Sequence, residues 1–252
     1  QAEKLVSVGS TFQDYYCGAL RYEIDLGEGE EREFCFAVGT ERAYADCVTS
    51  AKEYVSPTYF EKSLAEVLAQ NMRMAEVFRA ESPDEYLDLQ TNIWFKRQLS
   101  LGKTWGRVYG KGFRDVMQDI TAFVSFDPEL AKARILYALK HQYISGNPIR
   151  MYEPDFPYPY MDGAAWIPAT LLSYLKETAD FSVLDEKIPY LDSDAEETVF
   201  RHAERGLEFL FSSCGSRNLV LWGGGDWNDS MNNAGMLGKG ESVWLSVATY
   251  KA

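Results

Sequence analysis

The spacing of apolar residues changes near residue 41, and this change constrains the fold more than any single motif. Residues 17–39 alternate between polar and apolar around Gly27-Glu28-Gly29, which predicts a short β-hairpin. After residue 41, apolar residues recur at steps of three and four, as they do on amphipathic helices. The chain is therefore expected to be mainly α. Beyond residue 110 we expect helices at about 114–125, 128–144, 163–178, 195–213 and 241–251.

Signals that start or interrupt helices divide the rest of the chain. Ser82-Pro83-Asp84-Glu85 is typical of a helix start, with proline at the first helical position and acids in the first turn. Residues 145–162 contain four prolines and are not expected to be helical, and residues 215–240 form a second long, glycine-rich connection. Loops this long inside a compact helical domain are usually functional. We expect both to gather at one end of the helices and to line one pocket.

Composition argues against several kinds of partner and site. The 252 residues carry a net charge of −13 without a basic stripe, which argues against nucleic acid and anionic lipid. No apolar run reaches the ~18 residues of a membrane span. The first residues lack an export signal, so we expect a cytoplasmic protein whose chain begins within a longer polypeptide. Four scattered cysteines and two histidines predict neither a metal site nor a Ser-His-Asp mechanism, and we expect no cofactor.

Two interpretations of Asp162 compete, because it stands directly before a helix-like run. In one, its carboxylate caps the helix by accepting backbone N–H groups. In the other, it is a general acid that protonates a glycosidic oxygen, with its pKa raised by the aromatic, proline-rich segment before it. Cap bonds stabilise the anion. A catalytic Asp162 must therefore be free of that cap.

Two more acids lie on a predicted helix in the segment from Gly112 to Asp119. Asp115 and Asp119 are four residues apart and share one helix face, where like charges are unfavourable unless a cation or ligand compensates. Arg114 is one such cation. The alternative is that Asp115 accepts two hydroxyls of a sugar ring. The residues alone leave both interpretations open.

The turn Gly224-Gly225-Asp226-Trp227-Asn228-Asp229 combines short polar side chains with an indole. The polar groups of such a turn bond their own backbone, or they form a wall that binds sugar hydroxyls while the indole stacks on the ring. A general base among them would make the protein an inverting hydrolase, whose two carboxylates stand roughly 6.5–9.5 Å apart.

A basic cluster between residues 103 and 114 also has two interpretations. Lys103, Arg107, Lys111 and Arg114 alternate with glycines. They form a solvated surface or an anion site, since glycines let the backbone and guanidinium groups approach oxyanions closely. The later Gly238-Lys239-Gly240-Glu241 is too short for a phosphate loop.

Seven segments in this order resemble the glycoside phosphorylases of glycoside hydrolase family 94. That family includes cellobiose, chitobiose and 1,2-β-oligoglucan phosphorylases and the phosphorylase-like part of cyclic β-1,2-glucan synthases. No single segment is specific, but the combination is, and it covers nearly the whole chain. The segments are CGALRYEIDL, EREFCFAVG, SPDEYLDLQTNIWFKRQ, GFRDVMQD, MDGAAWIP, GGGDWNDSMN and GKGESVWL.

The resemblance implies a partial (α/α)6 barrel of the six-hairpin glycosidase type. Residues 1–40 would be the last strands of a β-sandwich domain, residues 41–81 linker helices, and residues 82–252 the first half of the barrel. The rest of the barrel and further phosphate ligands would lie beyond this chain. The remainder of its own polypeptide is thus an expected partner, a homodimer stays open, and the fragment alone is expected to be inactive.

The resemblance also implies a reaction and the residues that carry it. The reaction is inverting phosphorolysis of a β-linked gluco-oligosaccharide to an α-sugar 1-phosphate, in which phosphate is the nucleophile and no carboxylate base is needed. Asp162 would be the general acid, and Arg107 and Lys111 would bind phosphate. The residues assigned to substrate binding are Arg114, Asp115, Asp119, Trp166, Asp226, Trp227, Asn228, Asp229 and Glu241.

Three departures from the family pattern stand out. Members usually have two consecutive aspartates where this chain has Asp162-Gly163, so a supporting carboxylate is missing. The segment between Arg107 and Arg114 is short and lacks a glycine-rich insertion. Asn147-Pro148-Ile149-Arg150-Met151-Tyr152 replaces an aromatic cluster, so sugar specificity should differ. The alternatives to phosphorolysis are an inverting glycoside hydrolase on the same scaffold and a non-catalytic carbohydrate-binding segment.

Overall fold

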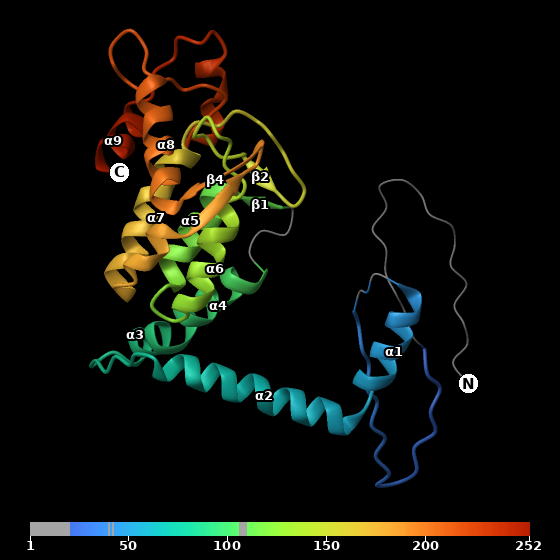
Figure 1. Cartoon of the computed structure of the whole chain (residues 1–252). Coiled ribbons are helices and arrows are strands. Elements are labelled where there is room, and N and C mark those ends of the chain that lie inside the picture. The colour runs from blue at the N-terminus through green and yellow to red at the C-terminus, as the bar shows by residue number, and fades with distance from the viewer. Residues whose placement is uncertain (1–20, 40, 42, 106–109) are drawn as a thin grey trace. The chain divides into compact units, whose positions relative to one another are not determined.

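The computed structural model describes residues 21–39, 41, 43–105 and 110–252. Its contacts divide the chain into two units, residues 1–68 and residues 69–252 (Figure 1). The boundary falls inside helix α2, Pro57–Glu76, which follows helix α1, Tyr44–Tyr54. The fold is mainly helical, as the apolar spacing predicts. None of the helices in the described part is long and apolar enough to cross a membrane.

The segment before α1 turns back on itself without forming a strand ladder among residues 21–39. Gly27 O accepts a hydrogen bond from Glu30 N at 3.1 Å. The ring of Tyr22 lies 5.5 Å from that of Phe34 across the turn, between centroids. The predicted turn is present, but the predicted strands are not, since an isolated two-stranded hairpin is at best marginally stable.

The second unit consists of helices with two pairs of short antiparallel strands. Figure 1 shows α5, α6, α7 and α8 packed side by side. Its elements are α3 Glu85–Leu89, η1 Gln90–Trp94, α4 Phe95–Trp105, β1 Lys111–Gly112, α5 Phe113–Phe123, α6 Pro128–Leu139, β2 Met151–Tyr152, α7 Gly163–Thr178, η2 Phe181–Asp185, β3 Lys187–Tyr190, β4 Ser193–Thr198, α8 Val199–Ser212, η3 Asp229–Gly235 and α9 Val243–Lys251.

Three helix ends correct the sequence predictions. Helix α6 ends at Leu139 rather than near residue 144, because the chain then turns and Gln142 pairs with Pro148. The carboxylate of Asp84 accepts from Tyr86 N and Leu87 N, so α3 begins after Asp84 and Pro83 lies outside the helix. Helix α8 begins at Val199 rather than near residue 195, because residues 193–198 pair with β3. The side chain of Thr198 then caps α8. The strands of this hairpin are too short and too polar to stand out in the sequence.

One apolar core holds α5, α6, α7 and α8 together. Phe113 and Met117 of α5, Ile135 of α6 and Ile167 of α7 each expose 1% or less of their surface. Burying a side chain of this size contributes about 1.5–3 kcal/mol. Because Phe113 is the first residue of α5, this core fixes the start of the helix that carries the next residue, an arginine, into the site described below.

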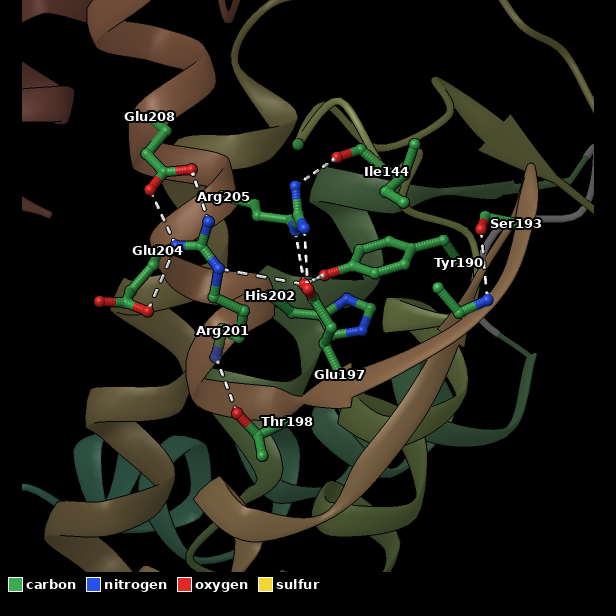
Figure 2. A network of polar contacts seen from close by, with 12 residues as sticks. Ile144, Tyr190, Ser193, Glu197, Thr198, Arg201, His202, Glu204, Arg205 and Glu208 are labelled. Carbon is green, nitrogen blue, oxygen red and sulfur yellow. Dashed lines mark hydrogen bonds and ion pairs between the residues drawn. The ribbon is translucent and has the colours of Figure 1, made fainter.

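The β3–β4 hairpin is fastened to α8 through one carboxylate (Figure 2). Glu197 accepts from Arg205 Nη2 at 2.8 Å and from the Tyr190 hydroxyl at 2.6 Å. The Arg205 hydrogen bonds, and then the one from Tyr190, lower the pKa of Glu197 to about 2. The hairpin therefore depends on an ionised Glu197.

A buried imidazole beneath this carboxylate connects the hairpin to the loop after α6. His202 Nδ1 lies 2.7 Å from Gln142 Oε1, and its Nε2 lies 3.0 Å from Ile188 O. Burial lowers the pKa of His202. The Gln142 amide also donates to Gly146 O at 2.7 Å, at the start of the first long loop. One polar cluster thus connects α8, the hairpin and this loop.

We predict that Glu197→Gln destabilises the second unit at neutral pH by about 1–2 kcal/mol, because charge-assisted hydrogen bonds are replaced by weaker ones in a partly exposed site. A carboxylate with a lowered pKa contributes stability above its ordinary pKa, and this contribution disappears as the pH falls towards about 2. Urea denaturation of both proteins between pH 7 and pH 3 measures the difference. Glu204→Gln, at the exposed Arg201 pair, is the control and should change stability by less than about 0.5 kcal/mol. A difference that does not shrink at acid pH would contradict the assignment.

Candidate active site

The two long loops meet at the N-terminus of α7. Met161 N donates to Gly225 O, and Gly224 N donates to Pro159 O, each at 2.9 Å. The side-chain amide of Asn147 donates to Tyr160 O at 2.8 Å and ties the first loop together. The prediction that the loops gather at one end of the helices is confirmed, but of the two loops only the first lines the void beside Asp162. Their meeting point positions Asp162.

Asp162 occupies the N-cap position of α7, but its carboxylate accepts no capping hydrogen bond. Its Oδ2 accepts from Arg114 Nη1 at 3.0 Å and from Trp166 Nε1 at 3.4 Å. Its Oδ1 is buried and has no hydrogen-bond partner. Only 1% of the residue is exposed. The cap interpretation is therefore wrong, and one carboxylate oxygen is free for a ligand.

Burial raises the pKa of the Asp162 carboxyl, while the ion pair with Arg114 and the weaker bond from Trp166 oppose this rise. Burial disfavours the charged form of an enclosed carboxyl, and it is the larger of these effects on the pKa of Asp162. The raised pKa lets Asp162 keep a proton at a higher pH than an ordinary aspartate. A general acid needs this direction of shift.

Arg114 joins Asp162 to the glycine-rich turn. It is the second residue of α5 and exposes only 5% of its surface. Besides Asp162, it donates to Asp226 O at 2.9 Å and to Asp229 Oδ1 at 2.6 Å. Its guanidinium lies 5.2 Å from the Trp227 ring centroid. Protein groups thus satisfy this guanidinium except at Nε, which is buried without a partner.

Asp226 is fully buried, and protein groups satisfy both of its carboxylate oxygens. One oxygen accepts from the backbone and side chain of Asn228 at 2.8 and 3.1 Å. The other accepts from the Ser242 hydroxyl, which caps α9 by accepting from Leu245 N. These are the turn-forming bonds of the structural interpretation. Asp226 holds the turn against α9 rather than facing a ligand.

Three indoles lie together over the turn. Trp227 is 42% exposed, with its ring centroid 5.5 Å from Trp166 and 6.1 Å from Trp244. Trp227 and Trp244 are nearly parallel, with an interplanar angle of 18°. Flat, partly exposed rings of this kind suit stacking against a sugar. Sequence analysis named Trp166 and Trp227 but missed Trp244, although it ends the GESVW segment of the family pattern.

Several predicted site residues make other contacts. Asp119 faces Gly102 of α4, whose Cβ would lie 3.8 Å from the carboxyl carbon. Asp115 lies in the first turn of α5, with its carboxylate against Gly112. Lys111 pairs with Glu153. These contacts do not include Asp162.

Glu241 and Arg107 complete the comparison with the predicted set. The side chain of Glu241 is 3% exposed and accepts from Arg217 N at 2.9 Å, which holds the loop after α8. Arg107 lies outside the described residues. Sequence analysis also missed Arg150 as a neighbour of Asp162. The one sequence signal for Arg150 was its position in residues 147–152, the segment that replaces the aromatic cluster of the family pattern.

A small void lies beside Asp162, lined among others by Arg150, Tyr160 and Pro148. Its volume of about 10 Å³ is at the lower limit of the ~10–15 Å³ that holds a water molecule. A substrate must therefore displace part of the cover to reach Asp162 in this conformation. The side chain of Asp229 is 60% exposed, so the covering Arg114–Asp229 pair reaches the surface.

The geometry and the motifs agree with sequence comparison. The sequence model of the Glycosyl hydrolase 94 superfamily, catalytic domain, matches residues 71–252. The chain belongs to this family. The resemblance read from the seven segments is confirmed.

Relatives in this family include phosphorylases and a glucan synthase. Solabiose phosphorylase from Paenibacillus borealis is 39% identical over 93% of this chain and 30% of that protein. Cellobionic acid phosphorylase from Neurospora crassa is 33% identical over 92% of this chain and 30% of that protein. Cyclic beta-(1,2)-glucan synthase NdvB from Rhizobium meliloti is 30% identical over 91% of this chain and 9% of that protein. The chain spans about a third of the length of the first two relatives.

We predict that Arg114→Met raises the pKa of Asp162 further, because burial then acts without the opposing ion pair. Carboxyl ¹³C NMR, with Asp162 assigned from an Asp162→Asn spectrum, measures this pKa. Breaking a buried pair costs about 3–5 kcal/mol, so Arg114→Lys serves as a milder variant that keeps the cation. It should shift the pKa in the same direction by less. An unchanged or lowered pKa in both variants would contradict the balance described above.

Proposed function

We propose that the complete protein carrying this chain is an inverting glycoside phosphorylase, which cleaves a β-linked gluco-oligosaccharide with inorganic phosphate and releases an α-sugar 1-phosphate. One observation carries the proposal: a buried carboxylate with a raised pKa and one oxygen without a partner, at Asp162. The names of the relatives that act as phosphorylases support the same reaction class.

In the proposed reaction, Asp162 Oδ1 donates its proton to the glycosidic oxygen as the bond to the anomeric carbon breaks. A phosphate oxygen attacks that carbon from the opposite face and forms the α-phosphate. Asp162 is left as a carboxylate, which Arg114 and Trp166 already contact. The ion pair disfavours the proton before the reaction and stabilises the anion that forms during it.

The environment of the other carboxylates supports phosphorolysis over hydrolysis. A hydrolase needs a carboxylate base to activate water. Both oxygens of Asp226 are occupied, and the residue is enclosed. Asp229 is exposed but paired with Arg114. Phosphate brings its own nucleophilic oxygen, so the proposed phosphorolysis needs no free carboxylate base.

The remaining assignments are part of the proposal. We infer that Asp115, Asp119, Trp166, Trp227, Asn228 and Asp229 help to bind the sugar, and that Trp244 extends the stacking surface. Arg107 and Lys111 remain our phosphate ligands. For Lys111 this requires exchange of its partner Glu153 for phosphate. We infer that Glu241 contributes to sugar binding only indirectly, through the loop after α8 that it holds by accepting from Arg217 N.

The architecture of the complete protein is also proposed. We infer that the chain contributes part of an (α/α)6 barrel, with residues 1–40 from a β-sandwich and residues 41–81 as linker. A groove of about 510 Å³ runs between α7 and α9, and Leu172 and Val247 on its walls are exposed. Apolar surface of this kind suits further helices of the same polypeptide. Residues 1–252 alone should therefore be inactive. A cytoplasmic location, a homodimer and the absence of a cofactor stay predictions.

We predict that Asp162→Asn in the complete protein lowers kcat for phosphorolysis by at least about 10²-fold, the lower end of the range for general acids. The wild type should lose activity as the pH rises through the raised pKa of Asp162, because only the protonated form donates. Phosphate-dependent release of sugar 1-phosphate is the measurement. Glu204→Gln on α8, which lies outside the proposed binding residues, is the control and should keep this activity.

Other outcomes would favour the alternatives. Cleavage that continues without phosphate and is lost in Asp229→Asn would identify a hydrolase with Asp229 as its base. Sugar binding without turnover, unchanged in Asp162→Asn, would identify a non-catalytic carbohydrate-binding protein.

A further inference from the structure

A second arginine lies beside Asp162, on a different element from Arg114. Arg150 directly precedes β2, and its carbonyl accepts from Phe113 N at 3.1 Å, at the first residue of α5. Its guanidinium lies 4.0 Å from the Tyr160 ring centroid, and that of Arg114 lies 5.4 Å from the same ring. Both arginines line the void beside Asp162. Backbone pairing and ring contact therefore hold Arg150 at the void that Asp162 also lines.

The two arginines differ in their partners. Arg114 contacts two carboxylates, from Asp162 and Asp229. Among the residues that the structure describes, no carboxylate forms an ion pair with Arg150. Arg150 is half-buried, so water solvates its charge only in part. A half-buried guanidinium without a counter-charge gains from a planar anion that takes two parallel hydrogen bonds.

The charge balance of the site points in the same direction. When Asp162 carries the proton that it donates, Arg114 is balanced by Asp229. Lys111, on the neighbouring strand, is balanced by Glu153. Of the two arginines that line the void, Arg150 is then the one that no carboxylate of the described residues pairs with. An anionic group on the ligand would complete this balance.

The position of Arg150 indicates which part of the ligand meets it. In an inverting reaction the acid stands on the side of the leaving group, and the nucleophile attacks from the opposite face. Arg150 shares the void of Asp162 and therefore lies on the side of the leaving sugar. Phosphate, as nucleophile, approaches from the other side.

We propose that Arg150 is a specificity-determining residue that binds the carboxylate of an acidic leaving sugar, an aldonic or uronic acid. This inference rests on the proposed function, since it needs a leaving sugar. In the reverse reaction the sugar acid is the acceptor. Its hydroxyl oxygen bonds to the anomeric carbon, Asp162 takes the hydroxyl proton, and phosphate leaves.

The test uses the complete protein in the direction of synthesis, with α-glucose 1-phosphate as donor and gluconate, glucuronate or glucose as acceptor. We expect wild-type kcat/KM to be at least about 10-fold higher for one of the acids than for glucose. Arg150→Gln should lower the value for that acid by about 10- to 100-fold, mainly through KM, and change the value for glucose by less than about 3-fold. Arg150→Lys should recover part of the loss, because lysine keeps the charge but not the planar fork.

Controls separate this inference from a general effect of charge or folding. Lys140→Gln removes an exposed cation at the end of α6 and should leave the preference unchanged. Thermal melting of each variant checks folding. Equilibrium binding of gluconate and glucuronate, measured by calorimetry, needs no turnover. It should weaken by at least about 10-fold in Arg150→Gln for the preferred acid.

Two results would overturn the role of Arg150. One is a wild type that prefers glucose, with the same acceptor preference in Arg150→Gln. The other is a rise in KM for glucose 1-phosphate in that variant without a change for the acids, which would assign Arg150 to phosphate. If instead the proposed function fails, glucose is transferred to none of the acceptors. Calorimetry then still tests whether Arg150 binds the sugar acids.

Discussion

The ion pair between Arg114 and Asp162 joins the three segments that make up the site. It connects the start of α5 to the start of α7, and through Asp229 it reaches the glycine-rich turn. The apolar core under Phe113 fixes α5, so the guanidinium reaches Asp162 from a rigid element. Burial and pairing act in opposite directions on the Asp162 carboxyl. In the proposed reaction, the same pair would tolerate a proton on Asp162 before proton transfer and stabilise the carboxylate after it.

Two aspartates in this region have different roles because their surroundings differ. Asp226 is fully enclosed, and Asn228 and Ser242 satisfy its oxygens, so it orders the turn and caps α9 indirectly. Asp162 is equally buried but keeps one oxygen without a partner. Buried polar groups are nearly always paired, so such an exception marks a position where a ligand is expected to supply the bond. The hydrogen-bond inventory, rather than residue type, distinguishes the structural carboxylate from the one that we propose as the general acid.

The sequence predicted α5, α7 and the start of α6 well from apolar spacing, although neither α5 nor α7 has a side-chain cap. It also predicted the meeting of the two proline- and glycine-rich loops. It missed the β3–β4 hairpin, whose stability comes from Glu197 and Arg205, contacts that no local pattern reveals. In the site, the motifs named Asp162 and Arg114 but not their pairing, which spans 48 residues. Arg150 and Trp244 went unnoticed because only the fold brings them to Asp162 and Trp227.

The single aspartate at the start of α7 is explained by packing. A Cβ on Gly163 would lie 2.5 Å from Pro148 Cγ, so the loop that replaces the family's aromatic cluster occupies the space that a second carboxylate would need. In this chain the two departures from the family pattern therefore lie in direct contact. A neighbouring carboxylate would raise the pKa of Asp162 by repulsion, whereas here burial raises it. Pro148 and Arg150 belong to the same loop, and both line the void beside Asp162. We therefore expect the pKa of Asp162 and the proposed preference for an acidic leaving sugar to be coupled through this loop.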